Sequence, residues 1–199
     1  MILQKFLQTA LEAGTDEAGR GCLAGPVTAA AVILPAGFAH STLTDSKKLN
    51  PVQRNGLRTV IESSCPHFGI AHVAPGEIDD LNILNASFLA MHRALDQINC
   101  DIPHIIVDGN RFAPYGNISH TCIVKGDAKF MSIAAASVLA KTHRDALMEK
   151  LHDEYPMYNW KRNKGYPTKE HRAAIAKYGL SPYHRKSFKL LPDQYRLAL

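Results

Sequence analysis

The chain has 199 residues, of which 46% are hydrophobic and 21% are charged, with 13 glycines and 11 prolines. Such a composition lets one domain bury a substantial core, and it excludes a disordered or fibrous protein. The formal net charge of +5 favours a polyanionic partner, although many basic proteins bind no nucleic acid.

Predicted strands and helices alternate along the chain. Short apolar or β-branched runs predict strands at Gly25–Leu34, Phe68–Val73, His104–Asp108 and Ile118–Val124. Apolar residues at helical spacing predict helices over Asp45–Cys65, Leu84–Ile98, Met131–Leu151 and Lys169–Tyr178. A loop rich in aromatic residues precedes the last helix. The alternation indicates an α/β layer fold, in which the first strands of the chain can pair as antiparallel hairpins.

Acidic residues occur at three places beside the predicted strands. Asp16 and Glu17 interrupt the approach to the first apolar strand. Asp108 ends another strand, and Asp127 follows a third one just before the long helix. Carboxylates at strand ends beside glycines tend to converge at one edge of a sheet, where ligands bind. An oxygen-rich cluster suits hard divalent cations, two of which can promote hydrolysis of a phosphodiester.

A single acidic residue at the end of a strand also has a simpler interpretation. It more often forms a turn or caps a helix than binds a metal. For Asp108, which precedes Gly109 and Asn110, this alternative would suffice. Four acids at three strand ends favour a shared site, but their spacing by itself leaves both alternatives open.

The cysteines and the N-terminal segment bear on the cellular compartment. Cys22, Cys65, Cys100 and Cys122 are scattered and form no Cys-x-x-Cys motif, which argues against a zinc ribbon or a disulfide framework. We expect all four to be small buried side chains. The apolar residues of Met1–Ala13 are interrupted by polar ones, so we expect no signal peptide and no membrane span. The sequence therefore predicts a cytoplasmic protein.

Other polar residues are expected to have structural roles. The ten histidines include no pair with the helical spacing and the glutamate of a zinc hydrolase. We expect His143 and His152 on a helix surface, and His184 in contact with backbone or phosphate. Arg144 and Asp145 are expected to form an ordinary surface pair.

A series of short sequence blocks follows a distinctive order along nearly the whole chain. The blocks are Thr15–Val27, Asp45–Leu49, Leu81–Asn85, Val107–Asn110, Lys125–Asp127, Ser132–Ser137, Ala140–Lys141, Asn163–Thr168 and His184–Phe188. Together they resemble the motifs of ribonuclease HII, the bacterial type 2 ribonuclease H. Each block is weak evidence by itself, and their number and order make the resemblance specific.

This resemblance implies a fold, an activity and a metal site. The fold is ribonuclease H-like: a mixed central sheet flanked by helices, with a small helical C-terminal extension. One domain would span residues 1–199, with a catalytic core of about 14–152 and a C-terminal substrate-binding loop and helices of about 153–199. The implied endonuclease hydrolyses the RNA strand of RNA–DNA hybrids and nicks DNA on the 5′ side of embedded ribonucleotides, leaving 3′-hydroxyl and 5′-phosphate ends. Two Mg²⁺ or Mn²⁺ ions would be held by Asp16, Glu17, Asp108 and Asp127.

The resemblance also implies how a ribonucleotide is recognised. Gly19, Arg20 and Gly21 match the family's Gly-Arg-Gly motif, which binds the 2′-hydroxyl and the adjoining phosphates. Tyr166 matches the tyrosine that packs on the next sugar. Without the resemblance, the glycines would be an ordinary turn and Tyr166 a half-buried aromatic residue of a loop.

Two regions match the family less decisively. Lys47 and Lys48 resemble phosphate-contacting lysines, but a solvated helix start is an alternative for both, and we favour it for Lys48. Phe130–Met131 follows Lys129 where many members carry small or polar residues. This departure puts in doubt whether Lys129 touches the substrate.

The sequence disfavours three other assignments. About fifteen residues precede the first motif, too few for the additional N-terminal domain of type 3 enzymes, so type 2 is favoured. Another carboxylate nuclease of the same fold, such as a junction resolvase or a type 1 enzyme, is disfavoured by the Gly-Arg-Gly motif and Tyr166. A noncatalytic nucleic-acid-binding module is disfavoured because all four acids are present. We expect a monomer that acts on nucleic acid without an obligate protein partner and without a membrane.

Overall fold

A computed structural model describes residues 3–7 and 11–191, and its centre is one mixed sheet. The strands are β1 (Ala13–Ala18), β2 (Val27–Ile33), β3 (His67–Val73), β4 (Ile105–Asp108) and β5 (His120–Ile123). They lie in the order β3-β2-β1-β4-β5. The pairs β1–β2 and β2–β3 are antiparallel, whereas β1–β4 and β4–β5 are parallel. The predicted mixed sheet and its antiparallel start are confirmed.

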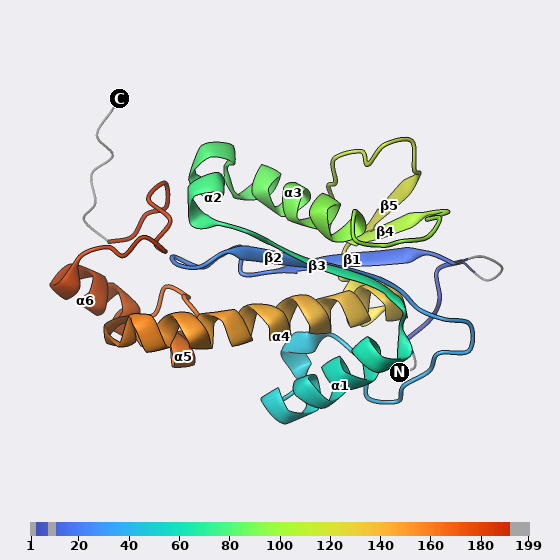
Figure 1. The fold of residues 1–199 in the computed structure, drawn as a ribbon, viewed down its shortest axis with the longest axis horizontal. Coiled ribbons are helices and arrows are strands. Elements are labelled where there is room, and N and C mark those ends of the chain that lie inside the picture. Colours follow the sequence, from blue (N-terminus) through green and yellow to red (C-terminus); the bar gives the residue numbers. More distant parts are fainter. Residues whose placement is uncertain (1–2, 8–10, 192–199) are drawn as a thin grey trace.

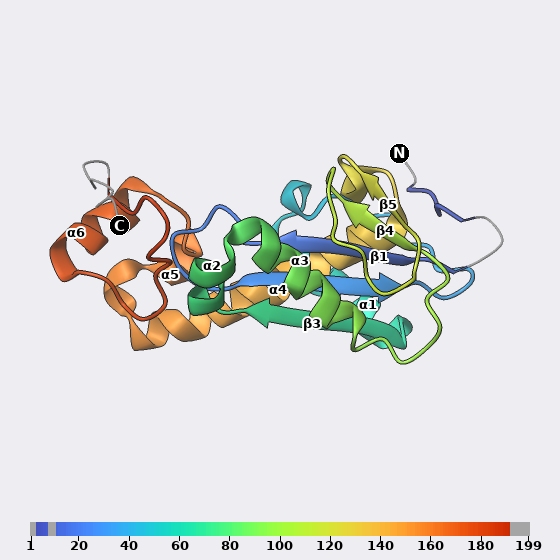
Figure 2. The same cartoon turned by 90° about the horizontal axis from the view of Figure 1, so that it is seen from above.

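Helices cover both faces of this sheet (Figure 1). They are α1 (Pro51–Ser64), α2 (Pro75–Leu81), α3 (Ile83–Leu95), α4 (Met131–Glu154), α5 (Trp160–Asn163) and α6 (Lys169–Tyr178), with short 3-10 turns η1 (Ser46–Lys48), η2 (Gly126–Ala128) and η3 (Pro156–Tyr158). In Figure 1, α2 and α3 lie on one face, and α4 and α1 lie on the other. The C-terminal part of α4, with α5 and α6, extends past the sheet as the expected small helical extension (Figure 2). Residues 192–199 of the predicted C-terminal region lie outside the described residues.

The strand β2 is buried on both faces because helices cover both sides of it. Ala29 and Ala31 belong to the core beneath α3, whereas Ala30 and Val32 belong to the core beneath α4. Successive side chains of a strand point to opposite faces, so a strand buried on both sides has a continuous apolar sequence. A third core joins the end of α4 to the C-terminal extension around Trp160.

Small residues bring α4 close to the sheet. A side-chain carbon at Gly14 of β1 would overlap the backbone of Ser132 and Ile133 at the start of α4. Alanine follows at the next three positions of the helix, and all three are buried. This close packing fixes the N-terminal half of α4 directly beneath the strand that carries Asp16.

The structure differs from the predicted elements in four places. Asp16 and Glu17 lie within β1, not ahead of the first strand, because the end of β1 reaches a sheet edge that ligands can approach. The predicted helix Asp45–Cys65 is divided, since Asn50 caps a new helix by accepting a hydrogen bond from the N–H of Gln53 at 2.9 Å. Helix α2 was not predicted, and α5 lies inside the predicted aromatic loop.

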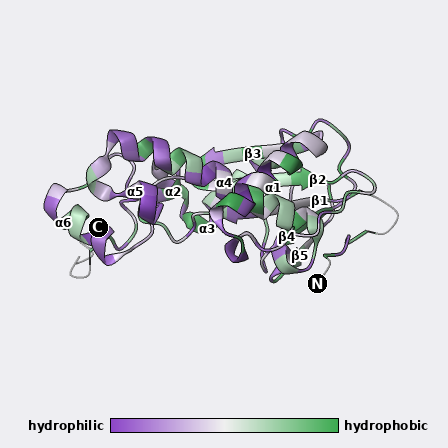
Figure 3. Ribbon diagram, turned by 90° about the horizontal axis from the view of Figure 1, so that it is seen from below, coloured by the Kyte–Doolittle hydropathy of each residue, from purple (hydrophilic) through white to green (hydrophobic). Residues whose placement is uncertain are grey.

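The hydropathy of the elements follows these layers. Seen from below, β2 is coloured as hydrophobic and α5 as hydrophilic (Figure 3). Within residues 3–7 and 11–191, every helix is too short or too polar to cross a membrane.

Candidate active site

Three carboxylates from separate elements converge at one edge of the sheet. Thr15 of β1 is level with Val107 of the parallel strand β4, so Asp16 and Asp108 follow at neighbouring positions. Asp127 lies in η2, shortly after the parallel strand β5. One carboxylate oxygen from each of the three acids lies within 4.8 Å of the others. The structure thus brings three of the four predicted acids together.

The charges of this cluster are not balanced within it. Burial raises the pKa of Asp16 well above its ordinary value, and the nearby Glu17 and Asp108 raise it further. Burial and Asp108 likewise raise the pKa of Asp127 to about 6. Asp108 is held in place by the N–H of Gly126, which donates to its Oδ1 at 2.7 Å. A divalent cation would relieve this repulsion, and a set of carboxylate oxygens is the donor set that such ions prefer.

Glu17 lies beside the cluster but outside the group of three. Its Oε1 atom forms an ion pair with Nη1 of Arg20 at 3.1 Å. Burial raises the pKa of Glu17, and Arg20 acts against this rise. Glu17 and Asp16 both line the cavity described below, so Glu17 is within reach of whatever the cavity holds.

Lys47 is the cation that faces the acids. Its N–H donates to the side chain of Asp45 at 2.9 Å, which caps η1, and Ser46 Oγ bonds Ser137 Oγ of α4 at 2.7 Å. Burial would lower the pKa of Lys47, but Asp16 and the other acids outweigh it, and the pKa is raised. The cluster therefore keeps Lys47 protonated.

A cavity of about 240 Å³ adjoins the acids and collects the residues predicted to bind nucleic acid. Its lining consists of Asp16, Glu17, Ala18, Gly19, Arg20, Gly21, Ser46, Lys47, Ser137, Lys141 and Tyr166. Tyr166 is 42% exposed, and burial of the rest of its side chain raises its pKa. Ser46, Ser137 and Lys141 were missed as lining residues, because neither motif nor spacing indicates which way a side chain of a packed helix points.

A second hollow of about 500 Å³ also adjoins the acids. Asp108 and Asp127 line it, together with Lys47, Lys48 and Lys125. The acid cluster thus borders two open spaces that both contain lysines, which suit a polyanion.

The predicted surface pair of Arg144 and Asp145 is wrong. Arg144 is only 1% exposed, and its guanidinium bonds backbone carbonyl groups. Asp145 pairs instead with Lys141, one helical turn earlier, at 2.6 Å. The reason is geometric, because adjacent residues of a helix point in different directions and residues four apart share a face.

Expectations for cysteine and histidine are met in part. Cys22 and Cys65 are buried, but Cys122 is only half-buried and Cys100 is exposed, so the prediction of four buried cysteines is wrong. The structure also places His184 in the interior, where its Nδ1 accepts a hydrogen bond from the N–H of Ser181 at 3.0 Å.

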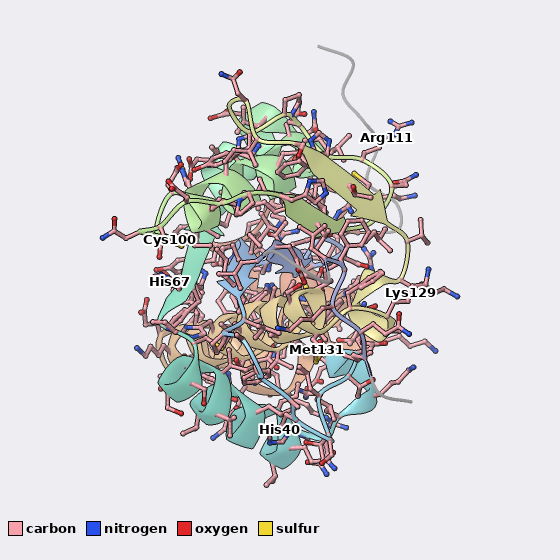
Figure 4. All side chains as sticks on the ribbon, turned by 90° about the vertical axis from the view of Figure 1, so that its right-hand side faces the viewer. His40, His67, Cys100, Arg111, Lys129 and Met131 are labelled. Carbon is pink, nitrogen blue, oxygen red and sulfur yellow. The ribbon has the colours of Figure 1, made fainter. Side chains whose placement is uncertain are left out.

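The departure at Phe130–Met131 is explained by packing. The Phe6 ring meets the Phe130 ring edge-on at 5.4 Å, and Met131 packs against the core beneath α4. Lys129 projects outward on the same side of the molecule as Arg111 (Figure 4). Its ammonium group donates to the Val124 carbonyl at 2.9 Å.

Solved structures with this fold define the class of protein. Ribonuclease H2 from Pyrococcus horikoshii is 25% identical with a TM-score of 0.77, over 91% of this chain and 95% of that one. The ribonuclease HII of Archaeoglobus fulgidus, solved in a complex with PCNA, is 25% identical with a TM-score of 0.70, over 94% and 98%. The Bst ribonuclease HIII, solved with Mn²⁺, has a TM-score of 0.72 at 17% identity, over 93% of this chain and 69% of that one, and shows the fold alone. The fold is that of ribonucleases H of types 2 and 3.

Sequence comparison identifies the family within this class. The family model described as Ribonuclease HII matches residues 13–191. Ribonuclease HII of Christiangramia forsetii is 68% identical over 93% of both chains, and that of Bacteroides thetaiotaomicron is 58% identical over 97% of this chain and 96% of its own. The chain belongs to the ribonuclease HII family. It is therefore a type 2 ribonuclease H, a hydrolase with endonuclease activity on nucleic acid, and its acid cluster suits a divalent metal.

Proposed function

We propose that this protein hydrolyses the RNA strand of RNA–DNA hybrids and nicks duplex DNA on the 5′ side of embedded ribonucleotides. The products would carry 3′-hydroxyl and 5′-phosphate ends. One observation carries the proposal: the converging acids Asp16, Asp108 and Asp127 adjoin the cavity that Gly19–Gly21 and Tyr166 line. A cleavage site and a sugar-recognition site would then contact adjacent nucleotides of one strand.

Asp16, Asp108 and Asp127, with Glu17 as a fourth ligand, would hold two divalent cations. The fit of these residues to divalent cations rests on their carboxylate oxygens and on the raised pKa values of Asp16 and Asp127, which reflect burial and the like charges of neighbouring acids. Oxygen ligands favour Mg²⁺ or Mn²⁺. When bound, such ions activate a water and neutralise the leaving oxygen of a phosphodiester.

The chain's own cations would position the substrate backbone. Lys47, which faces the acids, would bind a phosphate next to the scissile one as a point charge. Arg20 would offer its remaining guanidinium donors to a second phosphate, while Glu17 restrains it. These contacts hold the strand in register and carry no base-sequence information.

The ribonucleotide itself would be distinguished by its 2′-hydroxyl, which can donate and accept a hydrogen bond. The backbone of Gly19–Gly21 can approach this hydroxyl closely, because two of its three residues lack a side chain. Tyr166 would cover the next sugar with its ring and bond it with its hydroxyl. A site built around a hydroxyl rejects its absence strongly, since polar groups are then left unpaired.

The protein would act in the cytoplasm as a monomer. Its cysteines are free, which suits a reducing compartment. The Archaeoglobus relative was solved in a complex with PCNA, and we propose that this chain cuts without such a partner. Light scattering of the pure protein tests whether it is a monomer. A cleavage assay with the pure protein and no added partner tests whether it cuts by itself.

The deciding experiment uses three duplexes of one sequence: all DNA, DNA with one ribonucleotide, and an RNA–DNA hybrid. With Mg²⁺ or Mn²⁺ we expect cleavage of the second and third, and none of the first. Labelled ends would map the cut to the 5′ side of the ribonucleotide. Cutting of all-DNA duplex, cutting without a divalent metal, or a 3′-phosphate product would contradict the proposal.

A further inference from the structure

Two arginines are buried next to the predicted recognition site, and the acceptors of their hydrogen bonds are backbone carbonyl groups. Arg144 of α4 is 1% exposed, and Arg185 is 0% exposed. Within the described part of the chain, the ion pairs recorded involve neither residue. Because a buried charge is costly unless its donors are satisfied, these two guanidinium groups must be held by other acceptors.

Arg185 binds the backbone of the Gly-Arg-Gly turn. Its Nη2 donates to the Gly19 carbonyl at 2.8 Å, and its Nη1 donates to the Arg20 carbonyl at 2.9 Å. Its Nε donates to the Gly25 carbonyl at 3.0 Å, on the far side of the same loop. A guanidinium group has five N–H donors in a planar fork, so one side chain can bind three carbonyl groups at once.

This arrangement determines where the amides of the turn point. The described backbone contains no cis peptide, and in a trans peptide the carbonyl and the N–H point in opposite directions. The Gly19 and Arg20 carbonyls face Arg185, so the N–H groups of Arg20 and Gly21 face away from it, and both residues line the cavity. No backbone or side-chain acceptor is recorded for these two N–H groups among the described residues. They are donors available to a ligand.

Arg144 connects this loop to the segment that carries Tyr166. Its Nε donates to the Pro26 carbonyl at 2.9 Å and its Nη2 to the Ala24 carbonyl at 3.0 Å. Its Nη1 donates to the carbonyl of Lys164, two residues before Tyr166, at 2.8 Å. A side-chain carbon at Gly19, where φ is +93°, would overlap the Arg144 guanidinium. The arginine thus lies directly beneath the turn and fixes its separation from Tyr166.

We infer that Arg144 and Arg185 are positioning residues for recognition of the ribonucleotide. They aim the amides of Arg20 and Gly21 at the 2′-hydroxyl and its phosphate, at a set distance from Tyr166. The inference rests on the proposed function. Burial and the neighbouring Arg144 lower the pKa of Arg185 to about 10, so its fork of donors stays charged at neutral pH.

The test compares the affinities for two duplexes in a variant that is expected not to cleave them. In Asp16→Asn, we would measure by fluorescence anisotropy the Kd for a DNA duplex with one ribonucleotide and for the same duplex without it. Arg185→Lys in this background keeps the charge but replaces the planar fork of donors with one compact ammonium group, which cannot span the three carbonyls in the same geometry. We expect the preference for the ribonucleotide to fall about tenfold, with the Kd for all-DNA duplex changed less than about twofold.

A matched control separates positioning from stability. Arg172 of α6 also donates to backbone carbonyls, those of Lys189 and Leu190, but it lies outside the turn and the cavity. Arg172→Lys should leave the preference unchanged. If Arg185→Lys lowers the melting temperature but keeps the preference, the arginine has only a structural role and the inference is overturned. If Asp16→Asn alone shows no preference, the proposed function fails, and this inference fails with it.

A second measurement leaves Arg185 unchanged, so it tests the inference even if Arg185→Lys does not fold. In ¹⁵N-labelled Asp16→Asn, the amide signals of Arg20 and Gly21 should shift more with the one-ribonucleotide duplex than with the all-DNA duplex. Equal shifts with both duplexes would mean that these amides do not contact the 2′-hydroxyl, and would overturn the inference.

Discussion

The acid cluster and the arginine pair bury charge in opposite ways. Burial raises the pKa values of Asp16 and Asp127, and the like charges that these acids face raise them further. Arg144 and Arg185 are buried more completely, yet six carbonyl groups accept from their donors. The first region is completed only by a ligand, whereas the second is complete in the folded chain. We therefore expect the acid cluster to bind metal and support catalysis, and the arginine pair to hold the backbone in a fixed geometry.

The largest effect is expected from neutralising one acid. Asp16→Asn should lower Mg²⁺-dependent cleavage by about a thousandfold or more, because a metal ligand is lost. The melting temperature should stay the same or rise slightly, since repulsion in the cluster is relieved. Single-turnover cleavage and thermal unfolding would measure both. The exposed Asp80→Asn of α2 is the control, and substantial activity in Asp16→Asn or Asp127→Asn would refute the metal assignment.

A second prediction concerns acid stability of the C-terminal extension. Burial and the nearby His171 lower the pKa of His184 to about 4, so the unfolded chain binds this proton more readily. The stability from His184 is present above about pH 6.5 and is lost as pH falls toward 4. His184→Asn should remove about 2 kcal/mol of the difference in unfolding free energy between pH 7 and pH 4.5.

The pH dependence of stability must be compared between wild type and His184→Asn, because other groups also titrate in this range. The raised pKa values of Asp16 and Asp127 act in the opposite direction and stabilise the folded chain as pH falls. Urea unfolding at both pH values, with His67→Asn as a control at a half-buried histidine of β3, isolates the effect of His184. An equal pH dependence in wild type and His184→Asn would show that the buried ring does not resist protonation.

Tyr166 is expected to affect recognition and not metal binding. Tyr166→Ala should slow cleavage at a single ribonucleotide by about tenfold or more, through loss of the ring that covers the sugar. Tyr166→Phe should lie between, because it loses only the hydroxyl. Rates at saturating Mg²⁺ and calorimetric metal binding are the measurements, with the exposed Tyr178→Ala as a control. Equal rates in wild type, Phe and Ala variants would remove Tyr166 from the site.

The smallest effect is expected at Lys47. Lys47→Ala should lower the slope of log affinity against log salt by about 0.9 if it neutralises one phosphate of a DNA duplex. The exposed Lys150→Ala of α4 should leave the slope unchanged. Binding titrations at several salt concentrations measure this slope for each variant. The same slope and affinity in Lys47→Ala and wild type would make Lys47 a solvated residue of η1.

The acid cluster was easier to predict from the sequence than the arginine pair. Apolar runs with acids beside them indicate a sheet edge, because strand ends and ligand sites coincide in α/β folds. Arg144 gives no such signal, since its acceptors are carbonyl groups, two of them more than a hundred residues away, and carbonyls are the same in every residue. Its neighbour Asp145 suggested a pair that the helix geometry does not permit.

Boundaries were predictable where a capping residue or a glycine marks them. Helix α6 begins and ends as predicted, because Thr168 caps it and Gly179 follows it. Helix α2 has only seven residues, too few to establish a helical period in the sequence. The acids within β1 were assigned to a segment ahead of the strand, because polar residues obscure an apolar pattern where a strand reaches a binding edge.

Helix α4 also sets the spacing between the acid cluster and the arginine pair. It runs unbroken for 24 residues, with Ser137 bonded to the η1 segment near the acids and Arg144 beneath the Gly-Arg-Gly turn. One inserted residue between them would advance the later part by about 1.5 Å and rotate it by about 100°. Arg144 would then point away from its carbonyls, whatever residue was inserted. If the proposed function holds, the number of residues in this stretch of α4 sets the spacing between the cutting site and the recognition site, and its length is constrained even where the identity of its residues is not.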